Sequence, residues 1–446
     1  MTEPTDPTTS PHPDPQHEAV RICRELIRID SSNYGDGSGP GERAAAEYVM
    51  SELTEVGYDP VLLESAPGRA NVFLRIEGTD PGRGALVLHG HTDVVPAEAS
   101  DWKMDPFGGD EMDGLIWGRG AVDMKDMDAM MLAVLRDMAR TGRKPPRDLV
   151  VAFFADEEAG GRFGSHWAVD HHPEFFEGAT EAVSEVGGFS VEVGGQRAYL
   201  LQTAEKGIAW TKLIADGVAQ HGSQVSVDNA VARLAGAIAR IGAHRWPRSI
   251  TPTVHQLLQG VADLTGTAWD PTDPQGTDRL VAALGSAAKF VGATLSTTAN
   301  PTQLDAGYKA NVVPGQASGV IDVRYLPGGK DATMATLREL AGEGITFESV
   351  SEDIALEAPF GTDLTDAMTA AIRAEDPEAA VLPYMLSGGT DNKALKGLGI
   401  EGYGFAPLRL PADLDFAGMF HGVDERVPVD SVHFGVRVLD RLLRTM

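Results

Sequence analysis

Between residue 17 and about residue 200, amphipathic segments alternate with short apolar runs, and this alternation constrains the fold more than any other feature. Predicted strands lie at 71–78, 84–95 and 148–158, and predicted helices lie at 42–57 and 125–142. Such alternation builds a sheet with helices on both faces, in which ligands collect at the carboxyl ends of the strands. We therefore predict an α/β domain whose functional site lies at that edge.

From about residue 206 the pattern changes to a strand, helix and strand, followed by a further helix and strand. The predicted strands are 207–217, 316–326 and 345–351, and the helices are 228–241 and 331–340. This order predicts a small open-faced, ferredoxin-like α+β domain inserted into the first. We place a flexible Pro-rich tail at 1–16, the α/β domain at 17–205 and 354–446, and the insertion at 206–353. Residues 245–305 give no clear pattern.

The composition limits the binding partners and the cellular compartment that we expect for this protein. Asp plus Glu number 65 against 37 Lys plus Arg, a net charge of −28, which opposes binding to nucleic acid or to an anionic membrane surface. The only cysteine, Cys23, falls on the apolar face of a predicted helix. No apolar run approaches the ~20 residues of a membrane span, and the start lacks a signal-peptide core. We expect a reduced, cytoplasmic protein.

The stretch HGHTDVVP, residues 89–96, follows an apolar strand. Residues two apart in a strand share a face, so His91 and Asp93 point to the same side where the strand ends. A histidine beside a carboxylate is the arrangement of a metal ligand and the group that orients it. A structural pair is the alternative, and His89 is interpreted as structural.

Four further segments place acidic or histidine side chains at the edge of apolar structure. They are WGRGAVDMKD with Asp123, ADEEAGG with Glu157 and Glu158, SEVGG with Glu185, and FHGVDERVP with His421. Each alone has an ordinary explanation, such as a helix cap or a solvated loop. Together, His91, Asp123, Glu158, Glu185 and His421 supply the two histidines and three carboxylates of a two-metal hydrolytic site. Glu157 remains as a general base.

These motifs, in this order, resemble the M20 family of metallopeptidases and amidohydrolases, which includes aminoacylase-type, succinyl-diaminopimelate desuccinylase-type and glutamate carboxypeptidase-type enzymes. The resemblance covers the chain after the tail. It implies that Asp123 bridges two ions before a cis peptide bond to Met124. It further implies that His91 and Glu185 hold one ion, that Glu158 and His421 hold the other, that Asp93 orients His91 and that Glu157 is the base. The α/β domain would be catalytic, and the insertion would be a lid or dimerisation domain.

The resemblance extends to residues that would contact the substrate. His221 corresponds to a histidine that stabilises the oxyanion and that many relatives contribute across a dimer, although Gln220 and Gln224 depart from the usual motif. Asn311 and Arg324 correspond to residues that hold a substrate carboxylate, which an arginine fork fits. Gly388 and Gly389, in SGGTDN, would line the substrate pocket.

The predicted activity is hydrolysis of an amide or peptide bond in a small carboxylate-bearing substrate, with two zinc ions, or cobalt or manganese, as cofactors. A dipeptidase or carboxypeptidase is the favoured interpretation, and a deacylase of N-acyl amino acids is the alternative. A non-catalytic metal-dependent binding protein and a phosphoesterase are the remaining alternatives. A homodimer is expected from the resemblance, unless residues 245–305 block that contact.

Overall fold

The structure is a computed structural model that describes residues 12–446. Most of the predicted tail, residues 1–11, therefore lies outside the described residues. Helix α1 (Pro15–Ile27) begins within the predicted tail, because Asp14 accepts a hydrogen bond from the backbone N–H of Gln16 and caps it.

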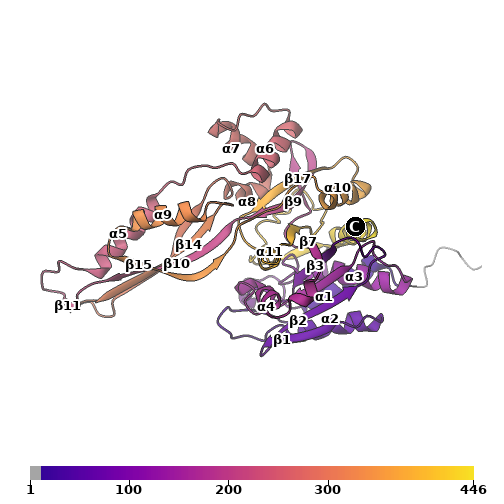
Figure 1. Cartoon of the computed structure of the whole chain (residues 1–446), viewed down its shortest axis with the longest axis horizontal. Coiled ribbons are helices and arrows are strands. Elements are labelled where there is room, and N and C mark those ends of the chain that lie inside the picture. Colours follow the sequence, from indigo (N-terminus) through magenta and orange to yellow (C-terminus); the bar gives the residue numbers. More distant parts are fainter. Residues whose placement is uncertain (1–11) are drawn as a thin grey trace, which may run out of the picture.

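The larger part of the molecule is built on a ten-stranded mixed sheet (Figure 1). Its strands are β1 (Val61–Ala66), β2 (Arg69–Ile76), β3 (Ala85–His91), β6 (Leu149–Phe154), β7 (Ala179–Ser184), β8 (Phe189–Val193), β9 (Gln196–Glu205), β16 (Leu356–Glu357), β17 (Ala380–Leu386) and β18 (Glu401–Gly404). The order is β1-β2-β6-β3-β7-β18-β9-β16, with β8 and β17 also paired to β9. Strands β6, β3 and β7 are parallel neighbours, so their carboxyl ends meet at one edge.

Apolar side chains of the central strands alternate between two cores. Leu86 and Leu88 of β3 enter the larger core, whereas Val87 enters the smaller one on the opposite face. The larger core includes side chains of α1, α2 (Arg43–Glu55), α3 (Lys125–Thr141), α10 (Asp363–Glu375) and α12 (Val429–Thr445), and the smaller core those of α4 (Ser165–His171) and α11 (Asn392–Lys396). Helices thus cover both faces, as the sequence predicts.

A separate four-stranded antiparallel sheet projects from this body (Figure 1). It has the order β12-β14-β10-β15, and its strands are β10 (Gly207–Asp216), β12 (Thr298–Ala306), β14 (Gln316–Tyr325) and β15 (Ile345–Asp353). Helices α5 (Ala230–Ala243) and α9 (Lys330–Ala341) cover one face and share its core. A two-stranded ribbon of β11 (Gln220–His221) and β13 (Val312–Val313) lies at the far tip. This confirms the predicted two-part fold.

The segment that gave no clear pattern contains α6 (Pro252–Thr265), α7 (Pro274–Ala282) and α8 (Ala288–Gly292). Its apolar side chains, including Leu257, Val261 and Val291, belong to the larger core of the main sheet. Helix α6 packs closely on β17, because a Cβ on Gly260 would lie 2.3 Å from Leu382. This segment therefore differs from the prediction that residues 206–353 form a single inserted unit.

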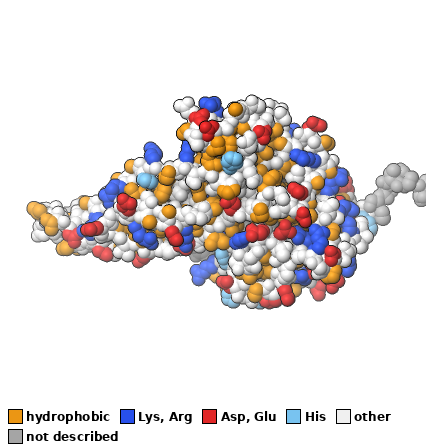
Figure 2. All heavy atoms as spheres, turned by 45° about the horizontal axis from the view of Figure 1, so that its top comes forward, with side chains coloured by type: hydrophobic (Ala, Val, Ile, Leu, Met, Phe, Trp, Pro, Cys, Tyr) orange, Lys and Arg blue, Asp and Glu red, His pale blue; other side chains and the backbone are white. Residues whose placement is uncertain are grey.

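The remaining elements are short. They are β4 (Asp110–Met112), β5 (Leu115–Trp117), β19 (Arg426–Pro428), and the 3-10 turns η1 (Ala99–Asp101), η2 (Glu157–Ala159), η3 (Pro173–Phe176) and η4 (Gly285–Ala287). Acidic and basic side chains are interspersed over the face shown in Figure 2. Within residues 12–446, no helix is long and apolar enough to cross a bilayer.

Candidate metal centre

The three parallel strands deliver polar side chains to one place. His91 ends β3, the turn that carries Glu157 and Glu158 follows β6, and Glu185 follows β7. Two more segments complete the cluster, because β5 pairs with β19 and brings the loop of Asp123 beside the loop of His421. The structure thus brings together all five predicted metal ligands and the predicted base.

Distances within the cluster place Asp123 between the two histidines. Nε2 of His91 lies 3.2 Å from Oδ1 of Asp123, and Nε2 of His421 lies 3.4 Å from Oδ2. Around His91, Glu185 is at 3.6 Å and Glu157 at 3.9 Å. Glu158 lies 3.0 Å from His421. Among residues 12–446, Asp123 is therefore the one carboxylate that contacts both imidazoles, one with each oxygen.

The chemistry of these donors suits divalent cations. Burial raises the pKa of Glu185 to about 8, and it raises the pKa of Glu157 well above its ordinary range. Hydrogen bonds to Asp123 and Glu158 raise the pKa of His421 to about 10. The cluster thus holds more buried carboxylate groups than its two imidazoles can neutralise, and divalent cations would supply the missing positive charge. Imidazole and carboxylate ligands fit zinc, and also manganese or cobalt.

In the described part of the chain, two overlapping groups of donors have ligand atoms within 4.8 Å of one another, and His91 belongs to both. One group adds Asp123 and Glu158, and the other adds Glu157 and Glu185. The second group contains Glu157, which the sequence assigns to proton transfer rather than to metal binding. Glu157 is thus close enough to the predicted ligands to exchange a proton with a molecule bound among them.

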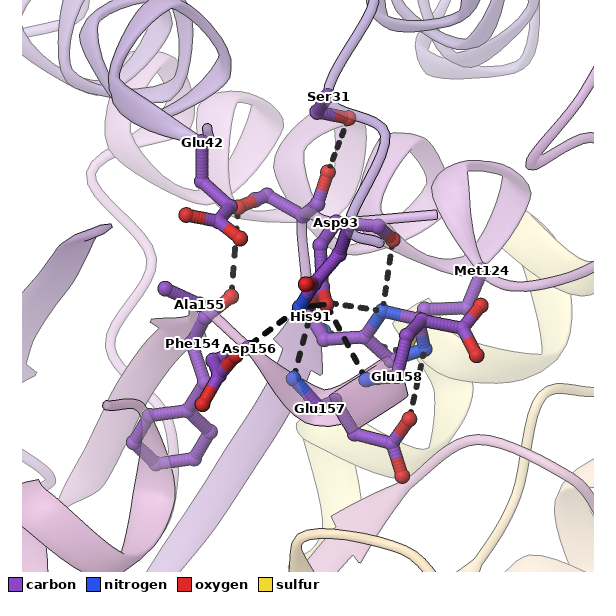
Figure 3. A network of polar contacts seen from close by, with 12 residues as sticks. Ser31, Glu42, His91, Asp93, Met124, Phe154, Ala155, Asp156, Glu157 and Glu158 are labelled. Carbon is purple, nitrogen blue, oxygen red and sulfur yellow. Dashed lines mark hydrogen bonds and ion pairs between the residues drawn. The ribbon is translucent and has the colours of Figure 1, made fainter. Parts of the chain in front are cut away.

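The carboxylate of Asp93 fixes the turn that carries the two glutamates (Figure 3). It accepts the backbone N–H groups of Glu157 and Glu158, both at 3.1 Å. It also accepts the side-chain amide of Asn33 at 2.9 Å. Nδ1 of His91 lies 3.0 Å from the backbone oxygen of Asp93 and 3.4 Å from its carboxylate. Asp93 therefore contacts His91 through its carbonyl as well, and it fixes the backbone of Glu157, the predicted base.

A residue that the sequence reasoning missed, Glu425, joins the two outer loops. Its buried carboxylate accepts the N–H groups of Gly120 at 3.1 Å, Val122 at 2.7 Å and Asp123 at 3.2 Å. It also pairs with Arg119 at 2.6 Å. The peptide bond after Asp123 is cis, as the resemblance implies. The sequence signal that could have identified Glu425 is its position four residues after His421, in the motif FHGVDERVP.

A pocket of about 500 Å³ opens over the cluster. Asp123, Glu157, Glu158, Glu185 and His421 line it, together with Arg324, Gly388 and Gly389, which were predicted to contact substrate. Two polar contacts in this pocket were not anticipated. Ser165 donates to Asp391 at 2.5 Å, and His166 of α4 lies 3.1 Å from the carboxylate of Asp353 at the end of β15. The second contact joins the projecting sheet to the main body.

Arg324 is in the pocket, but its guanidinium already has a partner. Its Nε and Nη2 donate to the two oxygens of Asp322 at 2.7 and 3.2 Å, and the group lies 5.8 Å from the Trp210 ring centre. A substrate carboxylate would therefore bind at the remaining Nη1 or displace Asp322.

His221 and Asn311 do not line this pocket. They lie together at the far tip of the projecting sheet, where the N–H of Gly222 donates to the backbone oxygen of Asn311 (Figure 1). The His221 side chain is exposed and contacts Ser223. His89 is buried and bonds to Asn392, while burial lowers its pKa to about 4, which suits a structural residue.

A cluster of imidazole and carboxylate donors of this kind, at the edge of an α/β sheet that carries a projecting second sheet, is typical of a class of two-metal hydrolases. The chain belongs to peptidase family M20/M25/M40, whose model matches residues 87–445. It is 27% identical to aminoacylase-1 of Sus scrofa over 444 residues, which cover 97% of this chain and 96% of the relative.

Solved structures share the fold over nearly the whole chain. An M20 family metallo-carboxypeptidase from Sulfolobus solfataricus superposes with a TM-score of 0.71 at 16% identity, covering 96% of this chain and 99% of that one. Human carnosine dipeptidase 1 superposes with a TM-score of 0.67 at 15% identity, covering 96% of each chain. The predicted family membership is confirmed.

Proposed function

We propose that the protein hydrolyses the amide bond of N-acyl amino acids with the help of two bound metal ions. The observation that carries this proposal is the buried cluster in which Asp123 contacts both His91 and His421 while Glu157 lies alongside. In this proposal, His91 and Glu185 would hold one ion, Glu158 and His421 would hold the other, and Asp123, which contacts both imidazoles, would contribute to both. Zinc is the proposed metal.

The proposed chemistry assigns a proton-transfer role to Glu157. Metal ions held at this site would polarise the scissile carbonyl and make water more acidic. Glu157 accepts the proton of the attacking water and then delivers it to the leaving amine. Its position supports this role, because the Glu157 carboxylate lies 3.9 Å from Nε2 of His91 and lines the pocket in which a substrate would bind. The N–H bond to Asp93 holds the Glu157 backbone in place meanwhile.

The similarity to aminoacylase-1 extends over nearly the whole of both chains. It supports an N-acyl amino acid, rather than a peptide, as the substrate of this protein. Its free carboxylate would bind near Arg324, with Gly388 and Gly389 lining the pocket beside it. Dipeptides are the second candidate, since they present the same amide and carboxylate and since a dipeptidase shares the fold.

His221 and Asn311 enter the proposal only through a second copy of the chain. Both lie at a tip that also exposes Val225, Val227 and Tyr308, which are 88%, 96% and 83% accessible. Apolar side chains at that tip are visible in Figure 2. Exposed apolar groups of this kind mark an association surface. A homodimer would allow the tip of one chain to reach the pocket of the other.

The test is hydrolysis of N-acetyl-L-amino acids and of dipeptides by the full chain, after removal of metal with a chelator and again after addition of zinc. We expect no turnover by the stripped protein, recovery with about two zinc ions per chain, and higher kcat/KM for the N-acyl amino acids. Turnover that persists without metal would contradict the mechanism. Preference for dipeptides would keep the mechanism and change the substrate.

A further inference from the structure

The pocket over the metal centre has an apolar side that the proposed chemistry does not use. Six apolar side chains line it: Val186, Ile208, Trp210, Phe290, Leu386 and Phe420. Ile208 and Trp210 belong to β10, whose alternate residues Ala209 and Thr211 are buried on the other face beneath the helices of the insertion. A pocket of about 500 Å³ has room for an apolar group next to the amide.

Phe290 comes from α8, in the helical segment that the sequence left unassigned. Helix α8 is anchored by Val291, which is fully buried, and by Ala287 just before it, which is 2% accessible. Phe290 itself remains partly exposed and faces the pocket. Side chains of α6, α7 and α8 belong to the larger core of the main sheet. The Phe290 ring is therefore attached to a helix that packs on that sheet.

The Phe290 ring also contacts the loop that carries His421. Its centroid lies 6.0 Å from that of Phe420, with the ring planes at 82°, and Phe420 lies 5.2 Å from Phe416 at 86°. Edge-to-face contacts of this kind hold rings in defined positions. Because Phe420 directly precedes His421, the rings of Phe290 and Phe420 lie on the His421 side of the metal cluster.

We propose that Phe290 and Phe420 form an apolar subsite that binds a linear aliphatic or aromatic group of the substrate and limits its size. The inference rests on the proposed function, because it concerns the same pocket. The group is either the acyl chain or the amino-acid side chain. Each substrate methylene that is buried against these two rings should raise kcat/KM about fourfold until the subsite is full.

Two substrate series separate these sources in the metal-loaded protein. One extends the acyl chain of N-acyl-L-methionine from acetyl to octanoyl, and the other varies the side chain of N-acetyl amino acids from glycine to phenylalanine. We expect a rise and then a fall of kcat/KM in one series. That series identifies which end of the substrate occupies the subsite.

Phe290→Ala should move the optimum to a larger group and lower kcat/KM for the best wild-type substrate about tenfold. Phe290→Trp should move the optimum to a smaller group. Phe175→Ala, which removes a half-buried ring stacked on Phe73 outside the pocket, is the matched control and should leave both series unchanged. Zinc content of every variant should stay at the wild-type value.

An unchanged size profile in both Phe290 variants, or an equal loss for all substrates, would overturn the subsite. If the wild type hydrolyses none of these amides, the proposed function fails instead. If it hydrolyses them with a profile that Phe290 does not alter, only the subsite fails.

Discussion

At the scale of single residues, one carboxylate can serve two neighbours. Asp93 accepts the N–H groups of both Glu157 and Glu158, so it fixes the proposed base and a proposed ligand in one turn. Sequence spacing predicted that Asp93 shares a face with His91. It could not predict these contacts, because they join residues more than sixty positions apart. Hydrogen bonds between distant segments depend on how the strands assemble.

Replacing Glu157 with glutamine should abolish proton transfer while preserving size. We expect kcat to fall by about 10²–10⁴-fold, because that is the usual contribution of a general base. Steady-state kinetics on the best amide, together with zinc content by mass spectrometry, would measure both effects. Glu343→Gln, an exposed carboxylate on the insertion, is the control. Loss of zinc in Glu157→Gln would assign Glu157 to metal binding instead.

Arg324→Lys tests the proposed carboxylate contact. Lysine keeps the charge but loses the planar fork, so kcat/KM for an N-acyl amino acid should fall about 10–100-fold. The corresponding N-acyl amino acid amide, which has no carboxylate, should be affected much less. Arg338→Lys is matched, because Arg338 also lies over an aromatic ring of the insertion, 5.9 Å from Phe347, outside the pocket. Equal losses for acid and amide would contradict this role.

At the scale of elements, the metal centre depends on loops that strand patterns do not describe. The sequence predicted a helix at residues 125–142, where the structure has α3 (Lys125–Thr141), because amphipathic periodicity is local. By contrast, α6, α7 and α8 were not assigned. Their sequence lies between two parts of the insertion, yet they pack on the main sheet. Which core a helix joins depends on long-range packing.

Glu425→Ala tests the link between the loops of Asp123 and His421. The change leaves Arg119 and three backbone N–H groups without their buried partner. We expect the free energy of unfolding to fall by about 3–5 kcal/mol, measured by chemical denaturation of the zinc-loaded protein. Glu401→Ala breaks a partly exposed pair with Lys396 and should cost about 1 kcal/mol or less. Similar losses in both variants would contradict the link.

At the scale of the whole molecule, the two sheets meet at the pocket. The fold was predictable in outline, because both sheets have strong local patterns. The positions of His221 and Asn311 were not, since motif order alone does not say whether the tip of the insertion reaches the pocket of its own chain. His166 of the body and Asp353 of the projecting sheet form one direct contact between the two parts.

The stabilisation from the contact between His166 and Asp353 should depend on pH. The hydrogen bond with Asp353 raises the pKa of His166 above its ordinary value of 6.5. Because the folded-state pKa is raised, the stabilisation is fully present below pH 6.5 and is lost as the pH rises through the raised value. The melting temperature of wild type should exceed that of His166→Gln by more at pH 5.5 than at pH 9. His171→Gln, on the same helix, should show no such difference.

Anomalous X-ray diffraction at the zinc edge, from crystals of the zinc-loaded protein, tests the central claim most directly. We predict two peaks about 3.5–4 Å apart. One should lie among His91, Asp123 and Glu185, and the other among Asp123, Glu158 and His421. A single peak, or peaks away from Asp123, would contradict the dinuclear centre on which the proposed function depends.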